Sequence, residues 1–166
     1  MPKYIYRNRQ YSVEPCVKED IPSHTERVLS YWESTNTTIS YQLSLLQSCI
    51  ETGEAFKVLD DSSNSIGCLY WKGISGKEAS VYFCWFKNGL ALALGQDYCY
   101  RYFPYETVYY MPHSRERLSY KSMLTLPSIL VFHKTNLPVP VNIRNPKMMK
   151  HYRRYFNDSE NSVKEV

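Results

Sequence analysis

The chain has 166 residues, a length that favours a single domain with room for a proper hydrophobic core. Hydrophobic residues make up 43% and charged residues 22%, as in ordinary soluble globular proteins. The net charge of +4 is only a mild bias, so it argues against a dedicated nucleic-acid binder.

The cysteines and histidines predict neither disulfides nor a metal centre. The five cysteines are widely spaced and include no Cys-x-x-Cys pair, and the four histidines show no pair at helix-face spacing. We therefore expect buried, reduced thiols, no metal and a cytoplasm-like compartment. No signal-peptide pattern and no apolar stretch of membrane-spanning length is visible, so we expect no transmembrane segment.

The first third of the chain is predicted to form a strand and two helices. Residues 11–16 favour a short strand broken by Pro15. Residues 23–26, with the sequence SHTE, match a capping box and predict the start of the first helix there. Residues 39–50 carry apolar side chains at helical spacing, and Gly53 is typical of the stop that follows a helix.

The rest of the chain alternates between strands and helices. A hairpin is predicted from the two strand-like runs at 54–61 and 65–74, with an apolar central strand at 79–86 after it. The further predicted elements are a helix at 89–103, a strand at 106–112, a helix at 115–126, strands at 128–134 and 138–143, and a basic helix at 145–156. Residues 157–166 are polar and are predicted to form a flexible C-terminal tail.

This order of elements indicates an α+β (α/β) domain around a mixed sheet. It also resembles the GNAT (GCN5-related N-acetyltransferase) family. Residues 13–21, VEPCVKEDI, are similar to the family's first strand and turn, and residues 54–71 are similar to its hairpin, with Gly67 entering the second strand. The resemblance implies one GNAT-like domain over residues 1–156, with a mixed, mostly antiparallel central sheet flanked by helices.

The family binds acyl-CoA where a central strand runs into the next helix, through a Q/R-x-x-G-x-G/A loop. Glycine lets the backbone amides approach a pyrophosphate, and the helix N-terminus adds a positive dipole end. In this chain Gly89 and Ala91 match the pattern, while Phe86 stands where Gln or Arg is expected. The resemblance implies acetyl-CoA as the acyl donor, bound at Phe86, Lys87, Asn88, Gly89, Leu90 and Ala91. An ordinary turn leading into a packed helix is the alternative.

A second alignment to the family competes with the first. Residues 142–156 resemble its N-x-x-N-x-x-(apolar)-x-x-x-Y signature, with Asn142, Asn145 and Tyr152 in place. The phosphate loop would then fall at residues 115–120, where Leu118 and Tyr120 replace both glycines and their side chains would block a pyrophosphate. We prefer the first alignment because it supplies every element of the fold.

The resemblance implies an acyl-CoA-dependent N-acyltransferase that transfers an acetyl group to an amine. Such a transfer needs a base to take the amine proton and an acid to protonate the leaving thiolate. The first alignment makes Tyr120 the candidate acid, and Glu106 and His113 the candidate bases at the two ends of a strand. Whether the chain is an active enzyme stays open at this point.

A non-catalytic role is the alternative function. Lys147, Lys150 and Arg154 share one face of the basic helix, which suits contact with an acidic surface. Small phage-type proteins that resemble acetyltransferases include internal virion components, so the resemblance also fits a virion, assembly or protein-interaction component. The partner is then a protein instead of an amine substrate, and the location is the cytoplasm or the virion.

Overall fold

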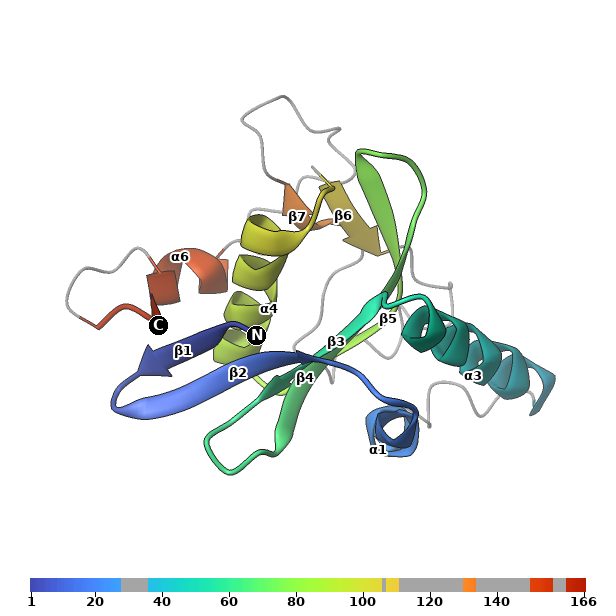
Figure 1. Ribbon diagram of the computed structural model, residues 1–166, viewed down its shortest axis with the longest axis horizontal. Helices are drawn as coiled ribbons and strands as arrows, with labels where there is room; N and C mark the ends of the chain where they lie inside the picture. The colour runs from blue at the N-terminus through green and yellow to red at the C-terminus, as the bar shows by residue number, and fades with distance from the viewer. Residues whose placement is uncertain (28–35, 106, 111–129, 134–149, 157–160) are drawn as a thin grey trace.

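A computed structural model of the chain describes residues 1–27, 36–105, 107–110, 130–133, 150–156 and 161–166 (Figure 1). Its strands are β1 (Lys3–Tyr6), β2 (Arg9–Pro15), β3 (Ala55–Leu59), β4 (Ser65–Gly73), β5 (Glu78–Phe86), β6 (Thr107–Tyr110), β7 (Leu130–His133) and β8 (Lys164–Glu165). Its helices are a 3₁₀ turn at Lys18–Asp20, α1 (Ile21–Glu26), α3 (Asn36–Glu51), α4 (Gly89–Tyr102) and α6 (Lys150–Phe156).

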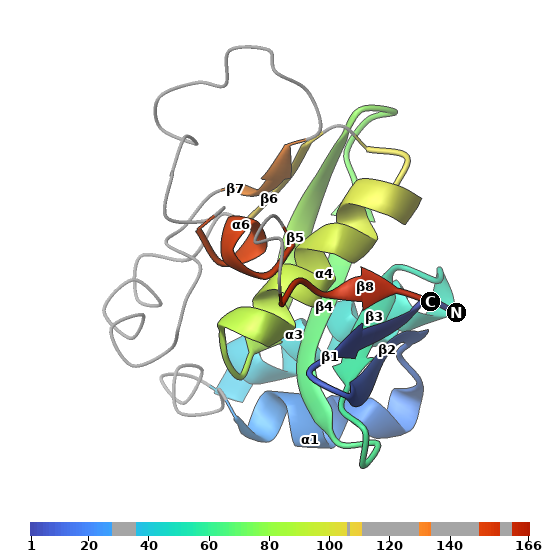
Figure 2. The same ribbon diagram turned by 90° about the vertical axis from the view of Figure 1, so that its left-hand side faces the viewer.

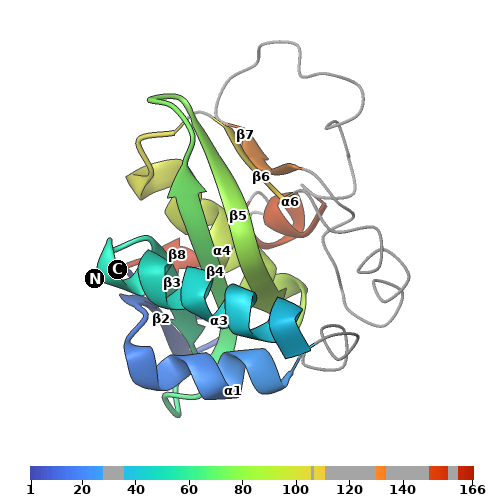
Figure 3. The ribbon, with the colours of Figure 1, turned by 90° about the vertical axis from the view of Figure 1, so that its right-hand side faces the viewer.

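The strands form a single mixed sheet in the order β7-β6-β5-β4-β3-β2-β1-β8. Neighbouring strands are antiparallel, except that β5 and β6 run parallel. Helices α1 and α3 cover one face of this sheet, and α4 and α6 cover the other (Figures 2 and 3). The predicted fold class, an α+β domain with a mixed, mostly antiparallel sheet flanked by helices, is therefore confirmed.

Each face of the sheet has its own hydrophobic core. The larger core lies between the sheet and α4, which buries nearly every residue from Gly89 to Cys99. The smaller core joins the sheet to α1 and α3 through Ile21, Leu46 and Phe83. All five cysteines are buried thiols.

Phe86 ties β5 to the centre of α4. Its ring occupies the space that a Cβ would need at two glycines, 2.5 Å away at Gly67 and 2.8 Å away at Gly95. Because real Cβ contacts are essentially never this short, a side chain at either glycine would displace the ring. Glycine has a low helix propensity. At position 95 of α4 it leaves the space that the Phe86 ring of β5 occupies.

The structure corrects the predicted start of the first helix. Helix α1 begins at Ile21, and Ser23 lies inside it with its Oγ donating to the backbone oxygen of Asp20 (3.1 Å). The Asp20 carboxylate accepts from the backbone N–H of Val17 (2.7 Å) and from Lys57 Nζ (2.9 Å). The capping box at residues 23–26 is therefore wrong, because Asp20 organises the chain that enters the helix. The predicted stop after α3 is confirmed, since Gly53 has a left-handed φ of +73°.

The two ends of the chain also differ from the prediction. Residues 3–6 form β1, a strand that the sequence did not predict, in a hairpin with β2. Residues 161–166 lie within the predicted flexible tail, yet they include β8, which pairs with β1, and the buried side chain of Val163. The strands at 79–86, 106–112 and 128–134 are confirmed as β5, β6 and β7. The helix predicted at 115–126 and the strand at 138–143 lie outside the described residues.

Candidate functional site

The parallel strands β5 and β6 are paired along only part of β5. The described pairs run from Glu78 opposite Thr107 to Val81 opposite Tyr110. Within the described part of the chain, residues 83–86 pair only with β4 on their other side, and Tyr82 lies at the register shift of that pairing. The carboxyl half of β5 therefore has no partner on the β6 side among the described residues, and it leads directly to the start of α4 (Figure 3).

The start of α4 has the geometry of a capped helix. Asn88 is the N-cap residue in an extended conformation, and its Oδ1 accepts from the backbone N–H of Ala91 (2.9 Å). The amide of Lys87 donates to the Ile66 oxygen (2.8 Å) and so closes the turn. The amides of Gly89 and Leu90 have no hydrogen-bond acceptor among the described residues. These two amides point out of a helix N-terminus, where the helix dipole favours an anion.

The predicted loop residues divide between surface and core. Lys87 and Asn88 are exposed, whereas Gly89, Leu90 and Ala91 are buried in the first turn of α4. The Phe86 ring, only 6% exposed, belongs to the core beneath the loop. Residue 86 therefore offers no polar side chain to the loop.

His151 is a residue of this site that the sequence did not single out. Its ring, carried by α6, lies against Gly89, because a Cβ at Gly89 would be 2.8 Å from the ring Cγ and closer still to Cε1 and Nδ1. Partial burial and the charges of Lys150 and Arg154 lower the pKa of His151. No local pattern reveals this contact, since His151 and Gly89 are far apart in the sequence.

A polar cluster below the loop holds α6 on α4. The buried Asp97 carboxylate accepts from Arg101 Nε (2.9 Å) and from the hydroxyl of Tyr152 on α6 (3.3 Å). Burial raises the pKa of Asp97, and its Arg101 and Tyr152 partners oppose that shift only in part. Arg101 also reaches Glu165 on β8 (Nε to Oε2, 3.2 Å), and Tyr102 donates to the same carboxylate. The cluster therefore fixes α6 and β8 relative to α4.

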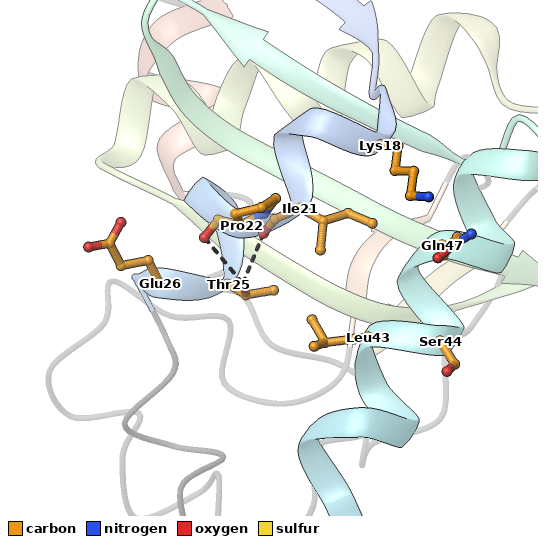
Figure 4. Close-up of a pocket in the computed structure, with 8 residues that line it drawn as sticks. All are labelled: Lys18, Ile21, Pro22, Thr25, Glu26, Leu43, Ser44 and Gln47. Atoms are coloured by element: carbon orange, nitrogen blue, oxygen red, sulfur yellow. Dashed lines mark hydrogen bonds between the residues drawn. The ribbon is translucent and has the colours of Figure 1, made fainter. Parts of the chain in front are cut away.

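A pocket of about 660 Å³ lies on the opposite face, between α1 and α3. Figure 4 shows Ile21 and Leu43 pointing into it, whereas Glu26 points away. The Thr25 hydroxyl donates to the backbone oxygens of Ile21 (2.9 Å) and Pro22 (3.2 Å), so it is already used within α1 (Figure 4). None of the predicted loop residues 86–91 is among the described residues that line this pocket.

The three predicted catalytic residues, Glu106, His113 and Tyr120, lie outside the described residues, so their roles stay predictions. The unit β5–α4–β6, a strand, a helix and a parallel strand, is what the first alignment requires at this place. Residues 115–120, Asn142 and Asn145, on which the second alignment depends, are also outside the described part of the chain.

The described ranges contain no cluster of three or more side chains suited to hold a metal ion. Within the same ranges, no helix has the length and apolar character needed to cross a membrane.

Comparison with known proteins gives matches among solved structures alone. No family model matches the chain, and no curated protein matches it. An acetyltransferase of the GNAT family from Listeria monocytogenes is 13% identical with a TM-score of 0.47, over 77% of this chain and 96% of that one. Spermidine N-acetyltransferase from Vibrio cholerae, in complex with CoA and spermine, is 15% identical with a TM-score of 0.43, over 67% and 76%. Mycobacterium smegmatis RimJ, in complex with CoA-disulfide, is 13% identical with a TM-score of 0.41, over 73% and 72%.

At these identities the likeness concerns the fold alone. The chemistry of the site has to be argued from its own residues.

Proposed function

We propose that the protein is an acyl-CoA-dependent N-acyltransferase, which transfers an acetyl group from acetyl-CoA to an amine. The observation that supports this proposal is that residues 82–86 of β5, next to the start of α4, have no partner on the β6 side among the described residues. A strand edge without a partner offers backbone N–H and C=O groups to an extended chain that contains amides. The pantetheine arm of CoA is such a chain, and its pyrophosphate suits a helix N-terminus.

The residues of the loop fit a pyrophosphate in part. The amides of Gly89 and Leu90 are available to it, and the exposed ammonium of Lys87 adds a positive charge. The Ala91 amide is already bound to Asn88, and Phe86 contributes no polar group. When bound, acetyl-CoA supplies the reactive thioester. In this proposal Glu106 or His113 takes the proton of the amine, and Tyr120 protonates the leaving thiolate.

The same site also supports a second candidate, a non-catalytic component on an acetyltransferase-like fold. Three features favour it: the buried Phe86, the capped Ala91 amide, and the His151 ring against Gly89. Each of them takes a position that a pyrophosphate or its polar ligand would use. A virion or assembly role, with the basic helix that includes Lys150 and Arg154 facing an acidic protein surface, belongs to this candidate.

Binding of acetyl-CoA separates the two candidates. Isothermal titration calorimetry of the wild-type chain is expected to give a dissociation constant in the micromolar range. Gly89→Trp is expected to abolish binding, because its side chain would cover the two available amides. Gly76→Trp is the matched control, since a side chain there meets nothing within 4 Å. Circular dichroism has to show that both variants are folded, because an indole at position 89 would also displace the ring of His151.

Absence of binding by the wild-type chain at millimolar acetyl-CoA would contradict the enzyme proposal and favour the non-catalytic candidate. If acetyl-CoA binds, release of the CoA thiol in the presence of amines measures turnover. Tyr120→Phe and Glu106→Gln are then expected to lower kcat by roughly 100- to 10,000-fold if these residues act as acid and base.

A further inference from the structure

Arg27 and Trp85 form a stacked pair at the carboxyl half of β5. Arg27 is the C-cap residue of α1, and the central carbon of its guanidinium lies 4.1 Å from the centroid of the Trp85 indole. Trp85 is half-buried and belongs to residues 82–86, which have no described partner on the β6 side. Its side chain packs on the core that faces α1 and α3. The pair therefore lies on the face of the sheet opposite to α4.

The Arg27 guanidinium is held in place without an acidic partner among the described residues. Two other cations on this face have acidic partners, since Lys57 pairs with Asp20 (2.9 Å) and Lys72 pairs with Glu54 (3.2 Å). Within the described ranges, no carboxylate lies at ion-pair distance from Arg27. Stacking on an indole orients the guanidinium plane and leaves the N–H groups on its edge available to a ligand. Such a fixed fork matches the two oxygens of a carboxylate.

The nearby histidine, His24, contributes no charge beside Arg27. Burial lowers the pKa of His24 to about 4, so this side chain is neutral at physiological pH. Neutral His24 is engaged with Tyr70 and Ser65 and offers no charge of its own. Arg27 therefore places a positive charge over Trp85, and this charge attracts an anionic group and disfavours a polyamine.

The location of this charge bears on the acceptor. Helix α4 lies on one face of the sheet, and α1, whose C-cap residue is Arg27, lies on the other (Figures 2 and 3). In the acyl transfer the amine nitrogen forms a bond to the acyl carbon, the carbon–sulfur bond breaks, and the proton released by the amine leaves with the CoA thiol. An acceptor that approaches from the α1–α3 face, away from the donor's phosphates, meets Arg27 and Trp85.

We propose that the Arg27–Trp85 pair selects acceptor amines that carry a carboxylate, such as amino acids, and disfavours polycationic amines. This inference rests on the proposed N-acyltransferase function and specifies its substrate class. Arg27 binds the carboxylate through two N–H groups, and the indole supports the guanidinium from below.

The experiment uses acceptors that differ only in the carboxylate. L-phenylalanine is compared with L-phenylalaninamide, L-leucine with L-leucinamide, and spermidine serves as the polycationic amine. The full chain is assayed by release of the CoA thiol at saturating acetyl-CoA. We expect kcat/KM for each carboxylate to exceed that for its amide by roughly 10- to 100-fold, as charge-assisted hydrogen bonds typically provide.

Variants of the cations on this side of the molecule identify the residue responsible. Arg27→Gln is expected to raise KM for the carboxylates until the preference disappears, and to leave kcat/KM for the amides unchanged. Lys18→Gln is the control, because Lys18 is an exposed cation just before α1 that stacks on none of the described rings. Its ratio of kcat/KM for the carboxylates to kcat/KM for the amides should equal that of the wild type. Acetyl-CoA affinity, measured by calorimetry, is expected to be the same in all three proteins.

The results distinguish this inference from the function on which it rests. If the wild-type chain does not bind acetyl-CoA, the proposed function itself fails. If acetyl-CoA binds and only the amides or spermidine are acetylated, the function stands and the Arg27 assignment is overturned. Binding of acetyl-CoA without turnover of any carboxylate, or an unchanged preference in Arg27→Gln, overturns it as well.

Discussion

At the scale of single residues, His24 shows how burial sets the charge of a side chain. The ring, carried by α1, is fully buried, with Nδ1 2.8 Å from the Tyr70 hydroxyl and Nε2 3.0 Å from Ser65 Oγ. Burial lowers the pKa of His24 to about 4, because an imidazolium there would lose its hydration. The negative charge of Asp20 opposes this shift and the positive charge of Lys57 adds to it. His24 is therefore a neutral core residue.

This pKa predicts a loss of stability in mild acid. The unfolded chain protonates its histidine near pH 6.5, so between pH 6.5 and 4 it binds more protons at this site than the folded chain. The contribution of His24 to the free energy of unfolding is complete above pH 6.5. It decreases as the pH falls to 4, by roughly 3 kcal/mol. Urea unfolding at a series of pH values measures this slope.

The matched variant for this prediction is His24→Gln, which keeps hydrogen-bonding groups but cannot titrate in this range. The difference between the wild-type and variant curves isolates His24 from the other ionisable groups, including Asp97. Parallel curves between pH 6.5 and 4 would contradict the prediction.

At the scale of elements, the sequence predicts those whose signals are local. The hairpin of β3 and β4, the strand β5 and the helices α3 and α4 combine apolar patterns with turn or capping residues of their own. Strand β1 was missed because it is four residues long and alternates weakly, with Lys3 and Ile5 exposed. It is held by β2 and β8 on its two sides, and pairing with a distant segment leaves no trace in a short window.

In the candidate site, too, the features set by neighbouring residues could be predicted and those set by distant residues could not. The turn of Lys87 and Asn88 into the helix at Gly89 could be predicted, because it depends on neighbouring residues. The environment of the turn could not. Phe86 is buried because two glycines from other elements, Gly67 and Gly95, make room for its ring. His151 covers Gly89 because Tyr152, the next residue of α6, is anchored on Asp97.

The contact between α4 and α6 predicts that the effect of Gly89→Ala on the free energy of unfolding changes sign when the His151 ring is removed. Gly89→Ala places a Cβ in the space of the His151 ring, so we expect a loss of about 1–3 kcal/mol in the free energy of unfolding. His151→Ala removes the ring. In that background Gly89→Ala is expected to be neutral or to stabilise by up to about 1 kcal/mol, because alanine is a better helix former than glycine.

Urea denaturation of the four proteins measures the coupling between the two positions. Gly76→Ala is the control, since nothing lies within 4 Å of a Cβ there, and it should change stability by less than about 0.5 kcal/mol. Equal effects of Gly89→Ala in both backgrounds would show that His151 does not occupy this space.

At the scale of the whole molecule, the two ends of the chain lie side by side and form one edge of the sheet, where β8 pairs with β1 (Figure 2). Val163 is 5% exposed, and its backbone N–H donates to the Tyr155 oxygen (2.7 Å). The Val166 amide donates to the Lys3 oxygen (2.9 Å), and Glu165 contacts Arg101 on α4. The polar composition of this segment predicts a flexible tail. The segment is nevertheless held in place, because Val163 anchors it with a buried apolar side chain.

Removal of residues 161–166 is therefore expected to destabilise the whole domain. Loss of the buried Val163 side chain alone is worth about 1.5–3 kcal/mol, and the pairing of β8 with β1 is lost as well. The truncation also exposes the outer edge of β1, and unpaired edges promote association between chains. We expect a lower midpoint in urea and concentration-dependent sedimentation of the truncated chain. Val166→Ser, at a side chain 76% exposed, is the control and should behave like the wild type. If the truncated chain unfolded at the wild-type midpoint and stayed monomeric, β8 would not be part of the cooperative fold.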